Sequence, residues 1–388
     1  MPFDPERAAR DVAELAPALR EVATNIHGSP ELRFQEQKAA AWLAEAVERE
    51  GVAVERALAG LPTAFRARAG RPGRARVAIL AEYDALPVIG HACGHNLIAG
   101  GALGAFLALA RQADAIGGQV ELVGTPAEEG GGGKIRLLER GVFEGVDAAI
   151  MFHPFDRDLT AHFTLANKWV SMTFRGKASH AALAPWDGAS ALTACLDTFR
   201  LVDGQRVHFR DGVRVHGFIK HGGDAVNIIP ERAEAEFSVR ARTLAELERV
   251  QAIVERCARG AAMAGGVEVE VVAKEGYKNL VTNLPLARRM GDKLRELGRD
   301  AAETDDDVGA GSTDMGDVSH AVPSLHAWLA ICDRGAATCH QQEFVKCAAS
   351  ERGFESMGVA AVAMARLAAD VLADARFRGE IAAAFAAR

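Results

Sequence analysis

The chain has 388 residues, 49% of them hydrophobic and 25% charged, proportions that are typical of a folded globular protein and exclude a disordered or fibrous one. Its formal net charge is −7 and no run of Lys and Arg stands out, so the charge pattern of a protein that binds nucleic acid or an anionic membrane is missing. We therefore expect small-molecule partners, with neither nucleic acid nor a membrane among them.

The N-terminus and one apolar segment bear on the location of the protein. The first six residues already include charged side chains and lack the apolar stretch of a secretory signal, which predicts a cytoplasmic protein. Residues 85–110 contain no Asp, Glu, Lys or Arg, but their unbroken apolar part, 97–110, has 14 residues, fewer than the ~18 that a membrane span needs. This apolar part is predicted to be a buried helix.

In the first part of the chain, helix and strand patterns alternate. Apolar residues recur at three- and four-residue steps over 35–50 and predict an amphipathic helix that ends before Gly51. Apolar runs at 77–80, 120–123 and 148–152 predict strands that are covered on both faces. Strands that alternate with helices in this way form a mostly parallel sheet.

The pattern changes near residue 168. Alternating, half-exposed strands are predicted at 169–175, 213–219, 233–239 and 267–272. The segment Thr243-Leu244-Ala245-Glu246 is a capping box that opens a helix. We therefore predict an α/β protein with two domains: a mostly parallel-sheet domain formed by residues 1–166 and 282–388, and an α+β domain inserted at 167–281.

Polar residues follow each of the three predicted parallel strands. They are Glu82 and Asp84 after the first strand, Glu128 and Glu129 after the second, and His153 after the third. Ligands of such sheets bind beyond the carboxyl ends of the strands, so a site is expected there.

The residue types at these positions favour a metal site. Cys93 and His95 offer a thiolate and an imidazole, which borderline divalent metals prefer, although alone they fit a buried cysteine beside a hydrogen-bonded histidine equally well. Neighbouring residues on an extended segment point opposite ways, so one carboxylate of Glu128-Glu129 could bind metal while the other faces the reacting water as general base. Three candidate sets at three consecutive strand ends make coincidence the poorer explanation.

Seven segments, spread along nearly the whole chain, carry a resemblance to a known family. They are SPELRFQE, EYDALPVIGHACGHN, GTPAEEGGGGK, MFHP, GKASHAA, VNIIPERAEAEFSVRA and GAGSTDMGDVSHAVPSLH. In their order along the chain and in their residues, these segments resemble peptidase family M20, the metal-dependent peptidases and amidohydrolases. The resemblance is strongest to the aminoacylase-like and aminobenzoyl-glutamate hydrolase-like branch. Within that branch, GHACGHN and GSTDMGDVS are most similar to the group that contains Xaa-Arg and β-alanyl-lysine dipeptidases.

The resemblance implies a catalytic domain with two metal ions and an inserted lid domain that also forms a dimer interface. The metal ligands that it implies are Cys93, His95, Glu129, His153 and His340, with His326 as the alternative to His340. It implies that Glu128 is the general base and that Asp84 orients a ligand histidine.

Two positions depart from the family pattern. Most branches use a His-x-Asp motif and a bridging aspartate, whereas here Glu82 stands before Tyr83-Asp84 and Cys93 belongs to the cysteine-containing pattern, which leaves the identity of the metal open. The branch pattern HACGHD has Asn96 in place of its last residue, a change expected to affect only contacts around the ligands.

Four residues outside the metal set resemble substrate-binding positions. His180 resembles the histidine that reaches the active site of the partner subunit and stabilises the oxyanion, although by itself it would be a surface histidine. Asn227 and Arg240 resemble the substrate-binding pair of the family, and the forked donors of arginine suit a carboxylate, although a strand arginine in a salt bridge is also common. Ser312 is expected to contact the same end of the substrate.

We therefore expect a cytoplasmic homodimer that hydrolyses the amide bond of a small N-acyl amino acid, N-aroyl amino acid or dipeptide, with two divalent ions per subunit. The thiolate favours zinc, and manganese and cobalt stay open. The alternatives are a hydrolytic deaminase of a small aromatic amine on the same site, a non-catalytic metal-bound protein that binds a small molecule, and a thiol-redox protein that uses Cys93, although the chain has no Cys-x-x-Cys. Lid side chains and dimer geometry set the pocket, so the substrate is left open.

Overall fold

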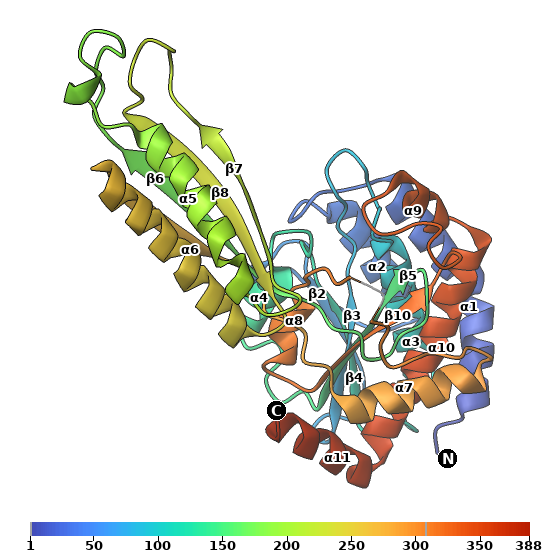
Figure 1. Cartoon of the computed structure of the whole chain (residues 1–388). Coiled ribbons are helices and arrows are strands. Elements are labelled where there is room, and N and C mark those ends of the chain that lie inside the picture. The colour runs from blue at the N-terminus through green and yellow to red at the C-terminus, as the bar shows by residue number, and fades with distance from the viewer. Residues whose placement is uncertain (1, 307–308) are drawn as a thin grey trace. The chain divides into compact units, whose positions relative to one another are not determined.

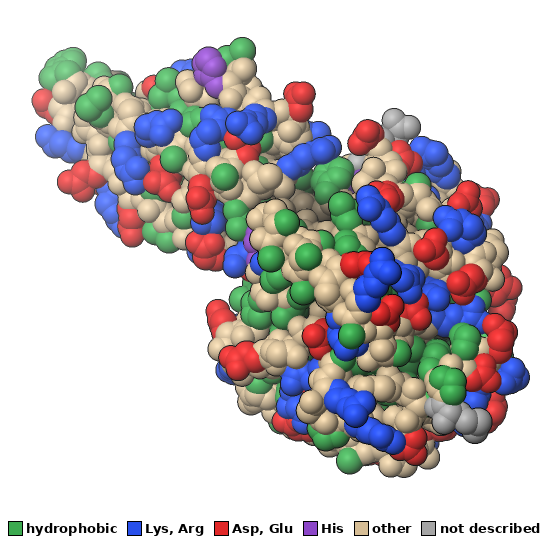
Figure 2. Space-filling view, turned by 90° about the horizontal axis from the view of Figure 1, so that it is seen from below, with side chains coloured by type: hydrophobic (Ala, Val, Ile, Leu, Met, Phe, Trp, Pro, Cys, Tyr) green, Lys and Arg blue, Asp and Glu red, His purple; other side chains and the backbone are tan. Residues whose placement is uncertain are grey.

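The computed structural model describes residues 2–306 and 309–388, and they divide into two compact units. The main unit is formed by Met1–Phe163, Leu280–Gly309 and Thr313–Arg388, and the lid unit by Thr164–Asn279 and Ala310–Ser312. The boundaries drawn from the sequence lie at 166/167 and 281/282, and they assign residues 310–312 to the main domain. On the face shown in Figure 2, basic and acidic side chains are interspersed over both units.

The main unit is built on a six-stranded sheet with the order β1-β2-β4-β3-β5-β10 (Figure 1). Its strands are β1 (Val54–Arg56), β2 (Phe65–Gly70), β3 (Arg76–Ala81), β4 (Gln119–Gly124), β5 (Ala148–Phe155) and β10 (Ser324–Ala330). Strands β4, β3, β5 and β10 are parallel neighbours, whereas β1 and β2 are added antiparallel at one edge. The predicted class, a mostly parallel sheet in an α/β fold, is confirmed.

Helices cover both faces of this sheet. One side is packed by α1 (Pro5–Gly28), α2 (Gln37–Arg49), α3 (His95–Ala110), α7 (Leu284–Glu296), α9 (Gln342–Cys347), α10 (Glu351–Ala373) and α11 (Ala375–Ala386). The other side is packed by α4 (Gly133–Glu139), α8 (Met315–Ser319) and the 3-10 turn η1 (Leu58–Gly60). The central strands β3, β4 and β5 are buried on both faces, which explains their continuous apolar runs.

The predicted buried helix is α3, which lies between the sheet and two outer helices. A Cβ at Gly104 would lie 2.8 Å from Leu19 of α1 and 3.1 Å from Ala361 of α10, so glycine is required for this close approach. The close fit fixes the start of α3, at His95, beside the carboxyl ends of the strands.

Helix α10 is long and apolar enough to cross a membrane by length and composition alone. However, 78% of its most apolar stretch is buried inside the main unit, against α3, α1 and α7. Its apolar composition therefore reflects its place in the interior.

The lid unit is a two-layer α+β structure. Its antiparallel sheet has the order β7-β8-β6-β9, formed by β6 (Ala166–Arg175), β7 (Arg214–His221), β8 (Arg232–Ala241) and β9 (Glu268–Glu275). Helices α5 (Ala191–Gln205) and α6 (Leu244–Gly265) pack on one face, and η2 (Pro185–Asp187) and η3 (Arg206–His208) are single 3-10 turns. Thr243 caps α6, because its Oγ1 accepts from the backbone N of Glu246 at 3.3 Å, whereas the Glu246 carboxylate bonds to Arg249 and does not close the predicted capping box.

Candidate metal centre

The candidate site forms where β3, β4 and β5 end side by side. Glu82 and Asp84 follow β3, Glu128 and Glu129 follow β4, and His153 lies near the end of β5. The structure therefore brings together the polar residues that the three strand ends predicted.

His95 is oriented by Asp84. Gly94 precedes α3 with a φ of 74°, a left-handed conformation that suits glycine, and a Cβ there would lie 2.9 Å from Pro154. His95 Nδ1 lies 2.9 Å from the backbone oxygen of Asp84 and 3.2 Å from its Oδ1, so Nδ1 carries the proton and donates. Nε2, the atom then left for a metal, is buried and has no hydrogen-bond partner in the described part of the chain.

Two groups of three metal-ligand atoms meet at Cys93. One group is Cys93, His95 and His153, and the other is Cys93, Glu129 and His340; the atoms of each group lie within 4.8 Å of one another. His153 Nδ1 donates to the backbone oxygen of Pro154 at 2.7 Å, which leaves its Nε2 as the ligand atom. A sulfur atom shared between two sets of donors fits a pair of ions better than a single one.

His340 rather than His326 completes the second group. His340 has a φ of 69° and its backbone N donates to Ala92 at 3.0 Å, so the turn that carries it is tied to the segment of Cys93. Its Nε2 lies 3.7 Å from Glu129 Oε1. His326 lies on β10 behind His153, with their ring centroids 5.4 Å apart, and joins no such group among the described residues.

The electrostatics of the site fit divalent cations. Burial, and then the charges of Glu82 and Glu129, raise the pKa of Glu128 well above its ordinary value. Glu82 Oε2 is buried, has no hydrogen-bond partner among the residues that the structure describes, and lies 3.6 Å from His95 Nε2. Burial opposes protonation of His95, but the hydrogen bond and charge of Asp84 outweigh it and raise the pKa of the imidazole. Buried carboxylates that crowd unpartnered ligand atoms would be stabilised by bound cations.

Lys134 is a buried cation that the sequence analysis did not single out. Its Nζ donates to Asp314 Oδ1 at 2.7 Å and to Glu82 Oε1, and its backbone N donates to Asp314 Oδ2 at 2.9 Å. Burial opposes its charge, but Asp314 and Glu82 outweigh burial and raise the pKa of Lys134. The signal available in the sequence was its place directly after the four glycines that follow Glu129.

Cys339 is a second residue that spacing along the chain did not reveal. Its thiol is a hydrogen-bonding neighbour of the Cys93 thiol, and this contact, followed by burial, raises the pKa of Cys93. The absence of a Cys-x-x-Cys motif therefore did not mean that Cys93 lacks a cysteine neighbour in space. The thiol-redox alternative therefore loses the argument from sequence spacing that had counted against it.

The four residues predicted to bind substrate fall into two places. His180 pairs with Ile228, and the backbone N of Ala181 donates to Asn227 at 3.0 Å, so His180 and Asn227 are neighbours. Arg240 lies near the end of β8, with its Nη1 3.4 Å from Ser312 Oγ, whereas Asn227 precedes the first residue of that strand. The lid thus groups His180 with Asn227 and Arg240 with Ser312, and the expectation that Asn227 and Arg240 both bind the substrate stays a prediction.

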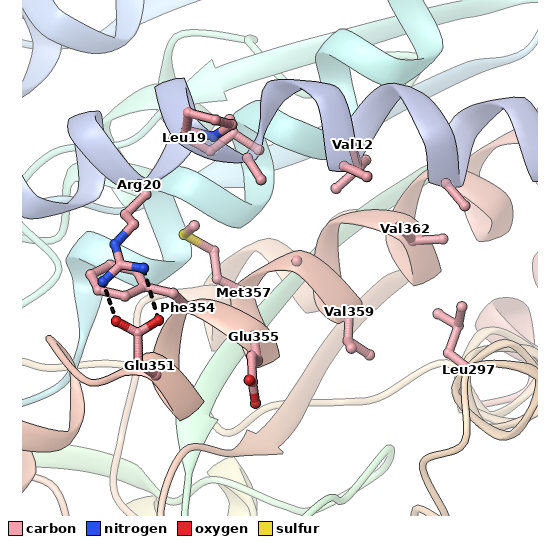
Figure 3. Close-up of a pocket in the computed structure, with 15 residues that line it drawn as sticks. Val12, Leu19, Arg20, Leu297, Glu351, Phe354, Glu355, Met357, Val359 and Val362 are labelled. Atoms are coloured by element: carbon pink, nitrogen blue, oxygen red, sulfur yellow. Dashed lines mark hydrogen bonds and ion pairs between the residues drawn. The ribbon is translucent and has the colours of Figure 1, made fainter.

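An apolar groove of about 780 Å³ on the main unit lies apart from these residues (Figure 3). It runs between α1 and α10, and its walls include Val12, Leu19, Phe354 and Val359. An ion pair between Arg20 and Glu351 closes one side. The groove contains none of the predicted site residues, so its apolar walls do not add to the candidate centre.

Comparisons with known proteins show the family of this chain. A model of peptidase family M20/M25/M40 matches residues 78–366. The Xaa-Arg dipeptidase of Mus musculus is 37% identical over 382 residues, which cover 94% of this chain and 88% of that protein. The p-aminobenzoyl-glutamate hydrolase of Escherichia coli (strain K12) has one subunit that is 33% identical over 301 residues, 72% of this chain and 62% of that protein.

Solved structures agree on the fold. A dinuclear metal-binding peptidase of the M20 family from Bacillus subtilis has a TM-score of 0.74 at 22% identity, over 93% of this chain and 99% of that one. A protein described as a putative aminohydrolase from methicillin-resistant Staphylococcus aureus has a TM-score of 0.82 at 21% identity, over 95% of this chain and 100% of that one. The chain belongs to peptidase family M20/M25/M40 and is a hydrolase of that family.

Proposed function

We propose that this hydrolase cleaves the amide bond of a small N-acyl amino acid, N-aroyl amino acid or dipeptide. The observation that carries the proposal is the pair of donor groups that share Cys93, with Glu128 beside them: Glu128 Oε2 lies 3.9 Å from His95 Nε2. The similarity to a protein named Xaa-Arg dipeptidase and to one named p-aminobenzoyl-glutamate hydrolase supports an amide substrate.

Two divalent ions would be held by the two donor groups, Cys93, His95 and His153 for one ion and Cys93, Glu129 and His340 for the other. When bound, such ions lower the pKa of a water molecule and polarise a carbonyl group. The thiolate favours zinc, and manganese or cobalt would suit the nitrogen and oxygen ligands.

Glu128 would move the proton. The residue is buried, with 8% of its surface exposed, and it directly precedes the proposed ligand Glu129 in the chain. It accepts the proton of the attacking water and then delivers it to the leaving amine, so one side chain serves both halves of the reaction.

His180 would stabilise the oxyanion from a second subunit. Its Nδ1 accepts from the backbone N of Ala182 at 3.2 Å and of Leu183 at 3.1 Å, so the neutral ring carries its proton on Nε2, which can then donate to a substrate oxygen. The side chain is exposed to solvent, so a second subunit could reach it. Asn227, its neighbour, would contact the substrate from the same side, whereas Arg240 and Ser312 would bind a carboxylate within their own chain.

A homodimer through the lid is part of this proposal. Strand β7 forms one edge of the lid sheet and pairs only with β8 among the described strands. Phe218 and Ile219 on this strand are 56% and 36% exposed, and Val226 and Ile228 in the following segment are exposed too. An open strand edge with apolar side chains is the kind of surface that a second copy would cover.

A hydrolysis screen tests the proposal. The protein is stripped with a chelator, reloaded with Zn, Mn or Co, and incubated with N-acyl amino acids, aminobenzoyl-glutamate and basic dipeptides. We expect metal-dependent release of two organic fragments from one of these classes. Release of ammonia alone would support the deaminase alternative, and tight binding of a substrate without any turnover would support a binding protein.

A further inference from the structure

The two backbone amides that flank Glu128 both donate to buried carboxylates. The backbone N of Ala127 lies 2.9 Å from Glu36 Oε1, and that of Glu129 lies 2.9 Å from Asp84 Oδ2. Asp84 already belongs to the candidate site through its bond to His95, whereas Glu36 comes from a distant segment of the chain, at the start of α2. The backbone of Glu128 is therefore held from both sides.

The oxygen of Glu36 supports two backbone positions of unusual conformation. Glu36 Oε1 also accepts from the backbone N of Phe34, at 2.8 Å. Phe34 and Ala127 have φ values of 61° and 60°, in the left-handed region that L-residues rarely adopt. Such conformations persist where the surrounding structure holds them, and here one carboxylate oxygen holds both.

The burial of the Glu36 carboxyl group is not explained by an ion pair. It is fully buried, and no Lys, Arg or His within the described residues forms an ion pair with it. Burial raises its pKa to about 7, and in either protonation state one of its oxygens keeps two lone pairs for the two amides. If Glu36 were removed, the buried amide of Ala127 would lose its acceptor directly beside Glu128.

We propose that Glu36 is a positioning residue for Glu128: by accepting from the backbone N of Ala127, it holds the turn that directs the Glu128 carboxylate into the site. The effect on turnover rests on the proposed function, because it requires Glu128 to act as the base. The effect on the turn itself does not.

The first test measures the turn without any substrate. Hydrogen exchange of residues 125–133 is compared in the metal-free protein for wild type, Glu36→Ala, Glu36→Gln and Glu31→Ala. Glu31 is a matched control, since it accepts from the backbone N of Lys38 at 2.9 Å and of Ala39 at 3.0 Å but does not contact the turn. We expect faster exchange only in Glu36→Ala, because glutamine keeps the accepting oxygen. Unchanged exchange in Glu36→Ala would overturn the proposal, whether or not the protein hydrolyses amides.

The second test is kinetic. Glu36→Ala is expected to lower kcat about a hundredfold at a nearly unchanged KM, the loss typical of a catalytic group displaced by ~1 Å, and Glu36→Gln is expected to restore it. In a Glu128→Gln background the same change should cause no further decrease. An equal decrease in both backgrounds would contradict the positioning role, whereas full turnover by Glu128→Gln alone would contradict the proposed function. If Glu36→Ala does not fold, Glu36→Asp, which withdraws the oxygen by one methylene, replaces it in both tests.

Discussion

The polar residues of the main unit and of the lid are held in opposite ways. In the main unit, the candidate ligands His95 and His153 have Nδ1 bonded to the backbone oxygens of Asp84 and Pro154, and the side chains of Cys93 and Glu128 beside them are buried. In the lid, His180 and Asn227 are exposed on a loop pair. The main unit therefore contains a preorganised centre, whereas these lid residues need another surface before they meet a substrate.

The largest expected effect is in the main unit. Glu128→Gln keeps the shape of the side chain and removes the base, so kcat should fall by roughly 10²–10⁴, the range for a general acid-base group. Metal content, measured by elemental analysis, should stay near that of wild type because Glu128 belongs to neither group that shares Cys93, and in its other groups, with His95 and Glu129 and with Glu82 and Asp314, glutamine keeps one ligand oxygen. Parallel loss of metal and of activity would show instead that Glu128 is a ligand.

The next effect tests whether the lid acts across a dimer. His180→Ala should lower kcat by about 10²–10³, the cost of one oxyanion donor. Mixed with Glu128→Gln protein and allowed to exchange subunits, it should regain activity, because one site of each heterodimer then has both Glu128 and a partner His180. If subunits exchange but activity does not return, His180 either acts in the site of its own subunit or has no role in catalysis.

Metal removal should lower the stability of the main unit more than that of the lid unit. A ligand at 100 times its Kd stabilises the unit that binds it by about 2.7 kcal/mol, so chelation should weaken the main unit by a comparable amount. Hydrogen exchange should then rise in α3 and in the 125–133 turn, while the lid core around Phe174 and Phe237 stays protected. A uniform rise across both units would show that their stabilities are coupled.

The smallest expected effect concerns substrate affinity in the lid. Arg240→Lys keeps the charge but loses the forked donor geometry, so KM for a substrate with a free carboxylate should rise about tenfold while kcat changes little. Ester or amide derivatives of that carboxylate should bind both proteins equally. A change in kcat alone would argue that Arg240 does not contact the distal end of the substrate.

Much of the fold could be predicted because its central strands carry a local signal. Strands β3, β4 and β5 are buried on both faces and read as apolar runs, and their ends located the candidate centre. Strand β2 has no such run, since Arg66 and Arg68 alternate with its apolar residues. Arg68 pairs with Glu121 of β4 at 2.9 Å, a contact that also explains the single charged residue within β4.

The supporting contacts of the centre could not be predicted in the same way. Glu36 and Ala127 are separated by 91 positions and Lys134 and Asp314 by 180, and no periodicity connects them. Cys339 meets Cys93 only through the fold. Such contacts arise from tertiary packing, so residue type and short spacing carry no signal for them.

The glycines of α3 have a consequence for any mutational library of this protein that is scored by activity. Gly100 and Gly104 leave room for Met357 and Leu19 of the outer helices, and Gly101 leaves room for Phe152 of the sheet. Gly104 is nine residues from His95, roughly 13 Å along the axis, yet a larger side chain there would shift the whole rigid rod and its first residue with it. Inactive variants would therefore be as frequent at these glycines as at the candidate ligands. Such a library would identify the packing of α3 as well as the residues of the site.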